Sequence, residues 1–395
     1  MSRGPDAAAP DLDYTLDLEG VRKRFEESTD FTMAVEEEFA IVNPESLELE
    51  HRFEDLFDAS QEDAVLADSA KGELIASEIE IRSGRAESFS EMVERQRDRR
   101  ARLFSLAEGM GLGLAATGTH PWANYLDQRI IGTPHYQRLE RELGYVAQRN
   151  NTWSLHVHMG IQGADRAIAV CDSLRGVLPL LLAVSANSPF LDGRDTRLHS
   201  VRSQIFTRTF PRCGIPDPFG SWSSYADFIE LLTRTRTIVE STQLWWSVRP
   251  HHAFGTVEVR ICDAQTGGEE SFGLAALIAA CIAQTARDHD EGRLGEPAHQ
   301  RELEENLWRA IRYGMDGRLI DLVEREEVEA RKALEEVLEW TAPMRDELDL
   351  EVDLPGLNGA QRARERLQRG TSLPDVYRDA VAETRRTYVP EGVLG

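Results

Sequence analysis

The chain is short of lysine and of positive charge. Its 395 residues include 45 Lys+Arg against 69 Asp+Glu, a net charge of −24 at pH 7. A protein that binds a nucleic-acid backbone needs a basic face to displace counterions, so we expect no nucleic-acid partner. Both a salt-adapted protein and a GC-rich genome would give this composition, in which the only lysines are Lys23, Lys71 and Lys332.

Cysteine is also scarce, and long apolar runs are missing. The longest apolar runs, 177–186 and 274–283, are shorter than the roughly 20 residues that span a bilayer. The first residues lack the apolar core of a signal peptide. We therefore expect a cytoplasmic protein with no membrane partner. No CxxC pair occurs and a disulfide framework would be unusual in so large a domain, so we expect four reduced thiols, Cys171, Cys213, Cys262 and Cys281.

The apolar pattern predicts strands scattered among helices. Strands are expected at 33–42, 77–83, 153–161 and 256–262, and helices at 18–25, 88–108, 165–186 and 225–241. Because the strands do not alternate regularly with helices, the sequence predicts an α+β fold with an antiparallel sheet, packed by helices, and a helix-rich C-terminal third. Residues 1–30 are expected to be a polar lead-in with no clear packing pattern, and residues 31–390 a single domain.

Three glycines between Gly109 and Gly113 suggest a comparison with nucleotide-binding loops. A dinucleotide fingerprint needs a strand before its glycines and a helix after them. Here a predicted helix precedes the glycines and an apolar strand over 112–117 follows. We therefore interpret them as the end of a helix.

The four predicted strands share one design, an apolar face behind an ionisable face. Side chains two residues apart on a strand point to the same side of the sheet. On each strand, apolar residues alternate with charged or imidazole side chains. The ionisable faces together hold Glu36 and Glu38; Glu78, Glu80 and Arg82; His156 and His158; and Glu258 and Arg260.

If these strands are neighbours, so many carboxylates repel one another unless a cation neutralises them. Carboxylate oxygens with an occasional imidazole suit Mg²⁺ or Mn²⁺, and Mg²⁺ is usually held by carboxylates together with substrate phosphates. Two other interpretations stay open. The polar faces could be ordinary solvated faces of an antiparallel sheet, and His156 with His158 could be a zinc pair, although no third soft ligand lies at a familiar spacing.

Three arginines are placed to bind an anionic substrate. Arg202 falls in a predicted polar loop, Arg249 precedes Pro250, and Arg260 shares its face with Glu258. Guanidinium groups bind carboxylates and phosphates through paired hydrogen bonds, so we predict that Arg249 and Arg260 contact a nucleoside triphosphate. Each arginine alone could equally form a surface ion pair.

Several ordered segments, weak singly but specific together, carry a resemblance to a known family. They are Val35-Glu-Glu-Glu-Phe39, Glu73-Leu74 to Glu80-Ile-Arg82, Gly118-Thr-His-Pro121, His156-Val-His158, Arg249-Pro250, Gly255-Thr-Val-Glu-Val-Arg-Ile-Cys-Asp263, Asn306-Leu-Trp-Arg-Ala310, Arg312-Tyr-Gly314 and Asn358-Gly-Ala360. Over most of 32–388, the chain resembles the glutamate–cysteine ligase type 2 family, in particular its carboxylate–amine ligase branch. It departs from the family pattern at Trp153-Ser-Leu155 and at Ala34.

The resemblance implies a glutamine-synthetase-like sheet whose ionisable face binds Mg²⁺ and the phosphates of ATP. Residue by residue, it implies metal ligands at Glu36, Glu38, Glu80, His156 and Glu258, and a phosphate or acyl-phosphate clamp at Arg260 and Arg202.

The reaction implied is ATP-dependent amide formation. The γ-carboxylate of glutamate is phosphorylated to an acyl phosphate, and the amino group of cysteine or another small amine then displaces phosphate. Two other functions stay open: a metal-dependent hydrolase that uses the same carboxylates, and a non-catalytic relative that binds nucleotide without turning it over. The amphipathic C-terminal helices are compatible with a homo-oligomer.

Overall fold

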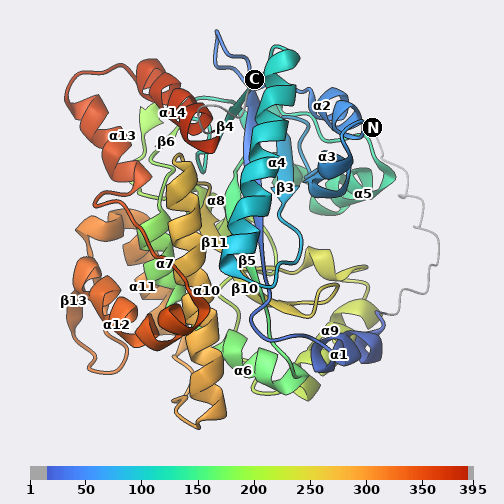
Figure 1. The fold of residues 1–395 in the computed structure, drawn as a ribbon, viewed down its shortest axis with the longest axis vertical. Helices are drawn as coiled ribbons and strands as arrows, with labels where there is room; N and C mark the ends of the chain where they lie inside the picture. Colours follow the sequence, from blue (N-terminus) through green and yellow to red (C-terminus); the bar gives the residue numbers. More distant parts are fainter. Residues whose placement is uncertain (1–15, 390–395) are drawn as a thin grey trace, which may run out of the picture.

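The computed structural model describes residues 16–389 and is built around one antiparallel sheet (Figure 1). The strands lie in the order β10, β11, β5, β1, β3, β2, and β4 pairs with the last residues of β1. The predicted α+β class with an antiparallel sheet is confirmed. The strands of this sheet are β1 (Met33–Val42), β2 (Ala70–Lys71), β3 (Glu78–Arg82), β4 (Gly113–Ala115), β5 (Ser154–Gly160), β10 (Val248–His251) and β11 (Thr256–Asp263).

Helices make up most of the remaining described chain, including its C-terminal third as predicted. They are α1 (Leu18–Glu26), α2 (Phe53–Ser60), α3 (Ala64–Ser69), α4 (Phe89–Gly109), α5 (Pro134–Leu143), α6 (Ala164–Leu174), α7 (Leu178–Ser185), α8 (Val201–Thr209), α9 (Trp222–Arg234), α10 (Gly268–Asp290), α11 (Gln300–Tyr313), α12 (Ala330–Leu348), α13 (Gly359–Gln368) and α14 (Leu373–Tyr388). Short strand pairs join β6 (Phe190–Leu191) to β7 (Arg194–Asp195), β8 (Cys213–Gly214) to β9 (Trp245–Trp246) and β12 (Arg318–Ile320) to β13 (Glu327–Glu329).

The apolar back of the sheet is covered by helices in two groups (Figure 1). Helices α6, α7 and α10 pack behind β5 and β11, where Val157 and Val259 are buried. Helices α4 and α14 pack behind β1, β3 and β4, where Phe39 and Ile79 are buried. The sheet thus turns its other face, the one predicted to be ionisable, away from both groups.

One charged residue lies on the apolar face. Glu37 points backward between the two groups of helices and forms a buried ion pair with Arg100 of α4. Ser271 and Gln96 donate to the same carboxylate, at 2.5 and 2.9 Å. The Arg100 guanidinium lies 4.3 Å from the centre of the Tyr388 ring. The two opposite charges of this buried pair therefore neutralise each other without help from water.

Two predicted helices differ in detail from the structure. The helix expected at 225–241 is α9, which begins at Trp222 and already ends at Arg234. The helix expected at 165–186 is divided into α6 and α7, which are bent by 62° where Pro179 enters the first turn of α7. No single helix within 16–389 has the length and apolarity of a membrane span, although α6 and α7 pass that test as a bent pair. Helix α4 ends at Gly109 and β4 begins at Gly113, so the glycines do end a helix, as predicted.

The predicted lead-in, residues 1–30, contributes to the core over its described part. Leu18, Val21 and Phe25 of α1 are buried in the group behind β5 and β11, and α1 contacts α6. The expected lack of packing here is wrong, because these three residues recur at helical spacing and form one apolar stripe. Residues 1–15 lie outside the described residues.

Candidate active site

The strand register brings the predicted carboxylates and imidazoles together on the front of the sheet. Glu36 lies across from Arg82 on one side and from His156 on the other. Glu38 lies across from Glu80. Arg82 Nε donates to Glu80 at 2.5 Å and lies 3.1 Å from Glu36. Three strands thus contribute to one charged surface.

Glu258 extends this surface onto β11. It lies across from His158 and from Arg249. Arg249 Nε donates to Glu258 Oε2 and Arg260 Nη1 donates to Oε1, each at 2.5 Å. Burial alone would raise the pKa of Glu258, but the two guanidiniums hold that pKa well below its ordinary value. Glu258 is therefore an ionised, fully buried carboxylate.

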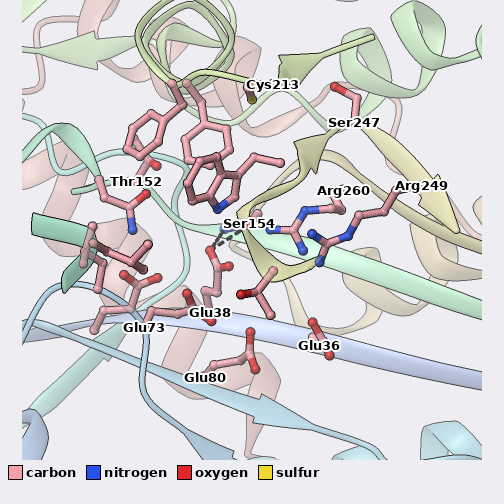
Figure 2. Close-up of a pocket in the computed structure, with 18 of the residues that line it drawn as sticks. Glu36, Glu38, Glu73, Glu80, Thr152, Ser154, Cys213, Ser247, Arg249 and Arg260 are labelled. Atoms are coloured by element: carbon pink, nitrogen blue, oxygen red, sulfur yellow. Dashed lines mark hydrogen bonds between the residues drawn. The ribbon is translucent and has the colours of Figure 1, made fainter. Parts of the chain in front are cut away.

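The charged surface is the floor of a pocket of about 320 Å³ (Figure 2). In Figure 2 the carboxylates of Glu36, Glu38 and Glu80 rise from the strands into this pocket, and Arg249 and Arg260 reach in beside them. The structure therefore places most of the predicted site residues around one cavity, whereas the predicted ligands His156 and Glu258 are buried and are not among the residues that line it.

Three groups of donor atoms on or beside this floor are close enough to hold a cation, with all atoms of a group within 4.8 Å of one another. They are Glu36, Glu80 and His156; Glu36, His158 and Glu258; and Glu38, Glu73 and Glu80. Oxygen donors with at most one imidazole fit Mg²⁺ or Mn²⁺ better than a thiolate-binding metal. Among residues 16–389, Glu78 Oε2 and His158 Nε2 are buried without a hydrogen-bond partner, as expected where a ligand completes the site.

The carboxylates of the floor differ in their readiness to ionise. Burial, together with the charge of Glu38, raises the pKa of Glu73 to about 7. Burial also raises the pKa values of Glu78 and Glu80 well above the ordinary range. Burial would do the same to Glu36, but the adjacent histidines hold its pKa well below the ordinary value. The floor lacks enough positive charge of its own, and a cation would complement it.

Ser154 fixes the imidazole and one carboxylate relative to each other. Its backbone N–H and its hydroxyl both donate to Glu38 Oε2, at 2.5 and 2.6 Å. Its Oγ lies 2.8 Å from His156 Nε2. With the Ser154 hydroxyl donating to Glu38, Nε2–H of His156 donates to Ser154 Oγ, and Nδ1 lies 3.3 Å from both Glu36 Oε2 and Arg260 Nη1.

A β-bulge lies where β11 carries Arg260. Between Val259 and Cys262, β11 advances three residues while β5 advances two. Ile261 consequently lines the pocket, and Cys262 turns toward α7, with Sγ 3.9 Å from the Leu181 carbonyl oxygen. Simple alternation places Ile261 on the apolar face, and it is indeed buried in the group behind β5 and β11, but the bulge brings it to the pocket as well.

Arg202 lies in the first turn of α8, not in the predicted loop. Ser200 caps this helix by accepting a hydrogen bond from the Ser203 N–H at 3.1 Å. The Arg202 guanidinium donates to the carbonyls of Ile261 and Arg260, at 3.1 and 3.3 Å, and lines the pocket. Arg202 and Arg260 therefore border the same cavity.

Apolar side chains form another wall of the pocket. They come from α5, from α8 and the residue that follows it, and from β9, and are Tyr136, Leu139, Leu143, Phe206, Phe210 and Trp245. Phe206 and Phe210 are stacked with ring centres 4.6 Å apart. The pocket thus combines an ionic floor with a wall that excludes water.

Three donors of the floor are missing from the ligand set predicted from the sequence: Glu73, Glu78 and His158. Glu73 lies in the loop between β2 and β3, where strand alternation cannot place a side chain. It does open one of the segments that carry the family resemblance, which is the signal that could have found it. Glu78 and His158 were assigned to the correct faces but were not selected as ligands.

Comparisons with known sequences agree on one family. A model described as glutamate-cysteine ligase family 2 matches residues 32–384. A Rubrobacter xylanophilus protein named "Putative glutamate--cysteine ligase 2-2" is 36% identical over 356 residues, which cover 90% of this chain and 91% of that protein. A Solibacter usitatus protein named "Putative glutamate--cysteine ligase 2" is 38% identical over 318 residues, covering 80% and 82%.

Solved structures share the fold. The crystal structure of glutamate–cysteine ligase from Francisella tularensis in complex with AMP matches with a TM-score of 0.66 at 13% identity, over 92% of this chain and 91% of that one. A bifunctional glutathione synthetase from Pasteurella multocida matches with a TM-score of 0.62 at 13% identity, over 93% of this chain and 53% of that one. Fold and site define a protein with a glutamate–cysteine-ligase-like sheet and an acidic face suited to cations. The chain belongs to glutamate-cysteine ligase family 2.

Proposed function

We propose that this protein is an ATP-dependent ligase that joins the γ-carboxylate of glutamate to the amino group of cysteine or another small amine. The observation that carries the proposal is the continuous floor of carboxylates and imidazoles, bordered by arginines, in a chain of this family. The family match favours this function over the metal-dependent hydrolase and over the non-catalytic relative.

The floor would hold Mg²⁺, with Mn²⁺ as a substitute. The ligand set we propose is Glu36, Glu38, Glu80, His156 and Glu258, extended by Glu73, whose carboxylate lies within the group formed with Glu38 and Glu80. When bound, the cations neutralise the acidic floor and screen the triphosphate of ATP.

The three predicted arginines have different proposed roles: two bind the substrate and one mainly supports a carboxylate of the floor. Arg202 and Arg260 border the pocket, and we propose that they bind the transferring phosphoryl group and the acyl phosphate. Arg249, the other predicted nucleotide contact, also lines the pocket, but all three of its nitrogen atoms already donate to Glu258 or to the Leu244 carbonyl. These bonds use three of its five N–H groups, so we propose that Arg249 holds Glu258 in place and contacts the nucleotide with the remaining two.

The reaction has two balanced steps. An oxygen of the glutamate γ-carboxylate attacks the γ-phosphorus of ATP, the bond to the β-phosphate oxygen breaks, and ADP leaves. The amino group of the second substrate then attacks the acyl carbon, loses a proton, and displaces inorganic phosphate. Phosphorylation is needed because a free carboxylate has no adequate leaving group, and the positive charges reduce the repulsion between the two anions. We propose that the protein acts on these small-molecule substrates in the cytoplasm.

A coupled assay of ADP release tests the proposal. Purified protein is incubated with MgATP, glutamate and a panel of amines that includes cysteine. We expect ADP and phosphate in equal amounts, dependent on both the glutamate and the amine. A folded, nucleotide-binding sample that releases no ADP with any pair contradicts the ligase. Hydrolysis of a phosphoester or amide without ATP would instead indicate the hydrolase.

A further inference from the structure

A buried aspartate joins the helix of Arg202 to the sheet. Asp263 is the last residue of β11, directly after the bulge, and has no exposed surface. Its carboxylate accepts hydrogen bonds from the Asn187 N–H at 2.8 Å, the Ser188 hydroxyl at 2.6 Å and the Ser200 hydroxyl at 2.9 Å. Three donors from two segments thus converge on a single carboxylate.

The two serines extend this anchoring to the start of α8. Because each hydroxyl proton is directed to Asp263, each Oγ is available to accept. Ser188 Oγ accepts from the backbone N–H of Arg202 at 3.2 Å, and Ser200 Oγ accepts from the N–H of Ser203 at 3.1 Å. Arg202 Nη1 itself lies 3.5 Å from Asp263 Oδ1. Both the backbone and the guanidinium of Arg202 are therefore placed relative to Asp263.

Close packing leaves Asp263 little room to move. A Cβ atom on Gly118 would lie 2.7 Å from the Asp263 carboxyl carbon and 2.9 Å from Ser188 Cβ, so only glycine fits at this contact. In the sheet, Asp263 lies across from Ser154, the residue that donates twice to Glu38. Asp263 therefore lies where the helix of Arg202 meets the strand that orients the acidic floor.

We propose that Asp263 is the positioning residue for Arg202, and that it holds the first turn of α8 against the bulge of β11 through the hydroxyls of Ser188 and Ser200. Asp263 is not among the residues that line the pocket, so its effect on the reaction passes through Arg202. This inference rests on the proposed function, in which Arg202 binds the transferring phosphoryl group.

A double-mutant cycle tests this dependence. Asp263→Asn keeps the shape of the side chain but removes its charge, and we expect kcat to fall about tenfold, as for other groups that orient a functional side chain. Arg202→Met should lower kcat about 100-fold. If Asp263 acts through Arg202, the double variant stays within about threefold of Arg202→Met. Independent effects would multiply to about 1,000-fold and would overturn the proposal, as would wild-type kinetics for Asp263→Asn.

A matched control separates positioning from simple loss of stability. Asp172 is also a buried aspartate that accepts backbone N–H groups, those of Phe219 and Gly220, and it does not line the pocket. Asp172→Asn should lower the thermal midpoint while leaving kcat and KM within about twofold. If Asp263→Asn does not fold, Ser188→Ala is the second variant, with a smaller loss of kcat expected in the same direction. Unchanged kinetics in that variant would contradict the proposal.

Binding of a non-hydrolysable ATP analogue with Mg²⁺, measured by calorimetry, gives a readout that does not depend on turnover. We expect Arg202→Met and Asp263→Asn each to weaken this binding, and the double variant to be no weaker than Arg202→Met. If the wild type releases no ADP with any substrate pair but this pattern holds, the ligase assignment fails while the role of Asp263 stands. If instead the losses of affinity of the two single variants multiply in the double variant, Asp263 does not act through Arg202, whether or not the ligase is active.

Discussion

Neighbouring residues on β1 have opposite tasks. Glu37 points to the back of the sheet and neutralises Arg100 within the core, whereas Glu38 points to the front and receives two hydrogen bonds from Ser154. Both carboxylates are buried, with exposed fractions of 3% and 7%. The two carboxylates therefore have different partners because they point to opposite faces of the strand, and not because one is more deeply buried than the other.

Glu38→Gln should abolish most activity while the fold persists. The amide oxygen can still accept from Ser154, but the charge that the donor group of Glu38, Glu73 and Glu80 offers a cation is reduced. We expect ADP formation to fall at least about 100-fold with little change in thermal midpoint. Glu37→Gln is the control: it leaves Arg100 buried without a charge partner and should cost about 3–5 kcal/mol of stability. Undiminished turnover in Glu38→Gln would refute the metal assignment.

His120 has a structural role that the sequence motif around it did not reveal. Its Nδ1 accepts the backbone N–H groups of Trp122 and Ala123, at 3.3 and 3.0 Å, so its Nε2–H donates to the Leu47 carbonyl at 2.8 Å. The neutral ring is fully satisfied, and burial lowers its pKa to about 4. Protonation would place a proton against two N–H donors.

This burial predicts a loss of stability in acid. The folded pKa of His120, about 4, lies below the unfolded value of about 6.5, so its contribution is complete above pH 6.5 and is lost as pH falls to about 4. The difference between the folded and unfolded pKa values corresponds to about 3 kcal/mol of folding stability at neutral pH. Urea unfolding at pH 7 and pH 4.5 should show a smaller pH dependence in His120→Asn, whose side-chain oxygen can replace Nδ1. An equally steep dependence in the variant would exclude His120 as a cause.

Among the secondary-structure elements, the strands were the most predictable. β1, β3 and β5 are regular, so a period of two placed Glu36, Glu80 and His156 on one face. The order of the strands could not be read from the sequence, because pairing depends on contacts between distant segments. The bulge in β11 was equally inaccessible, since the Arg202 guanidinium, more than 50 residues earlier, donates to its carbonyls. Loop residues such as Glu73 have no periodicity to reveal them.

Helix α14 supports the sheet from behind, and this support can be measured at Tyr388. The Tyr388 ring contacts Phe39 and Phe104 with centres 5.5 and 5.7 Å apart, and its hydroxyl donates to the Gln265 carbonyl at 2.7 Å. Tyr388→Ala should cost about 3–5 kcal/mol in chemical denaturation. Tyr388→Phe, which removes only the hydroxyl, should cost about 1 kcal/mol. Equal losses in both variants would show that the hydrogen bond, not the ring, matters.

For the molecule as a whole, the dominant electrostatic quantity is the net charge of −24. Many surface arginines are paired, as in Arg129 with Glu54 and Arg102 with Asp98, but acidic residues outnumber basic ones too far for complete pairing. Like charges in excess repel one another in the compact state more than in the unfolded chain. Screening should therefore favour folding.

The thermal midpoint should rise by a few degrees between 0.05 and 1 M KCl, since the screening length shortens from more than 10 Å to about 3 Å. The same series at pH 5, close to the sequence pI of about 4.9, should show a smaller rise because the net charge is then near zero. A midpoint that falls with salt at pH 7 would mean that surface ion pairs outweigh the net repulsion.

The contact between β1 and α14 also bears on biosynthesis. Phe39 of the first strand packs against Tyr388, a residue that the ribosome adds almost 350 positions later. Until α14 emerges, the strand that carries Glu36 and Glu38 has part of its apolar back uncovered, and the nascent chain exposes a surface prone to aggregation. The strand that carries Glu36 and Glu38 is thus synthesised long before the helix that completes the cover of its apolar back.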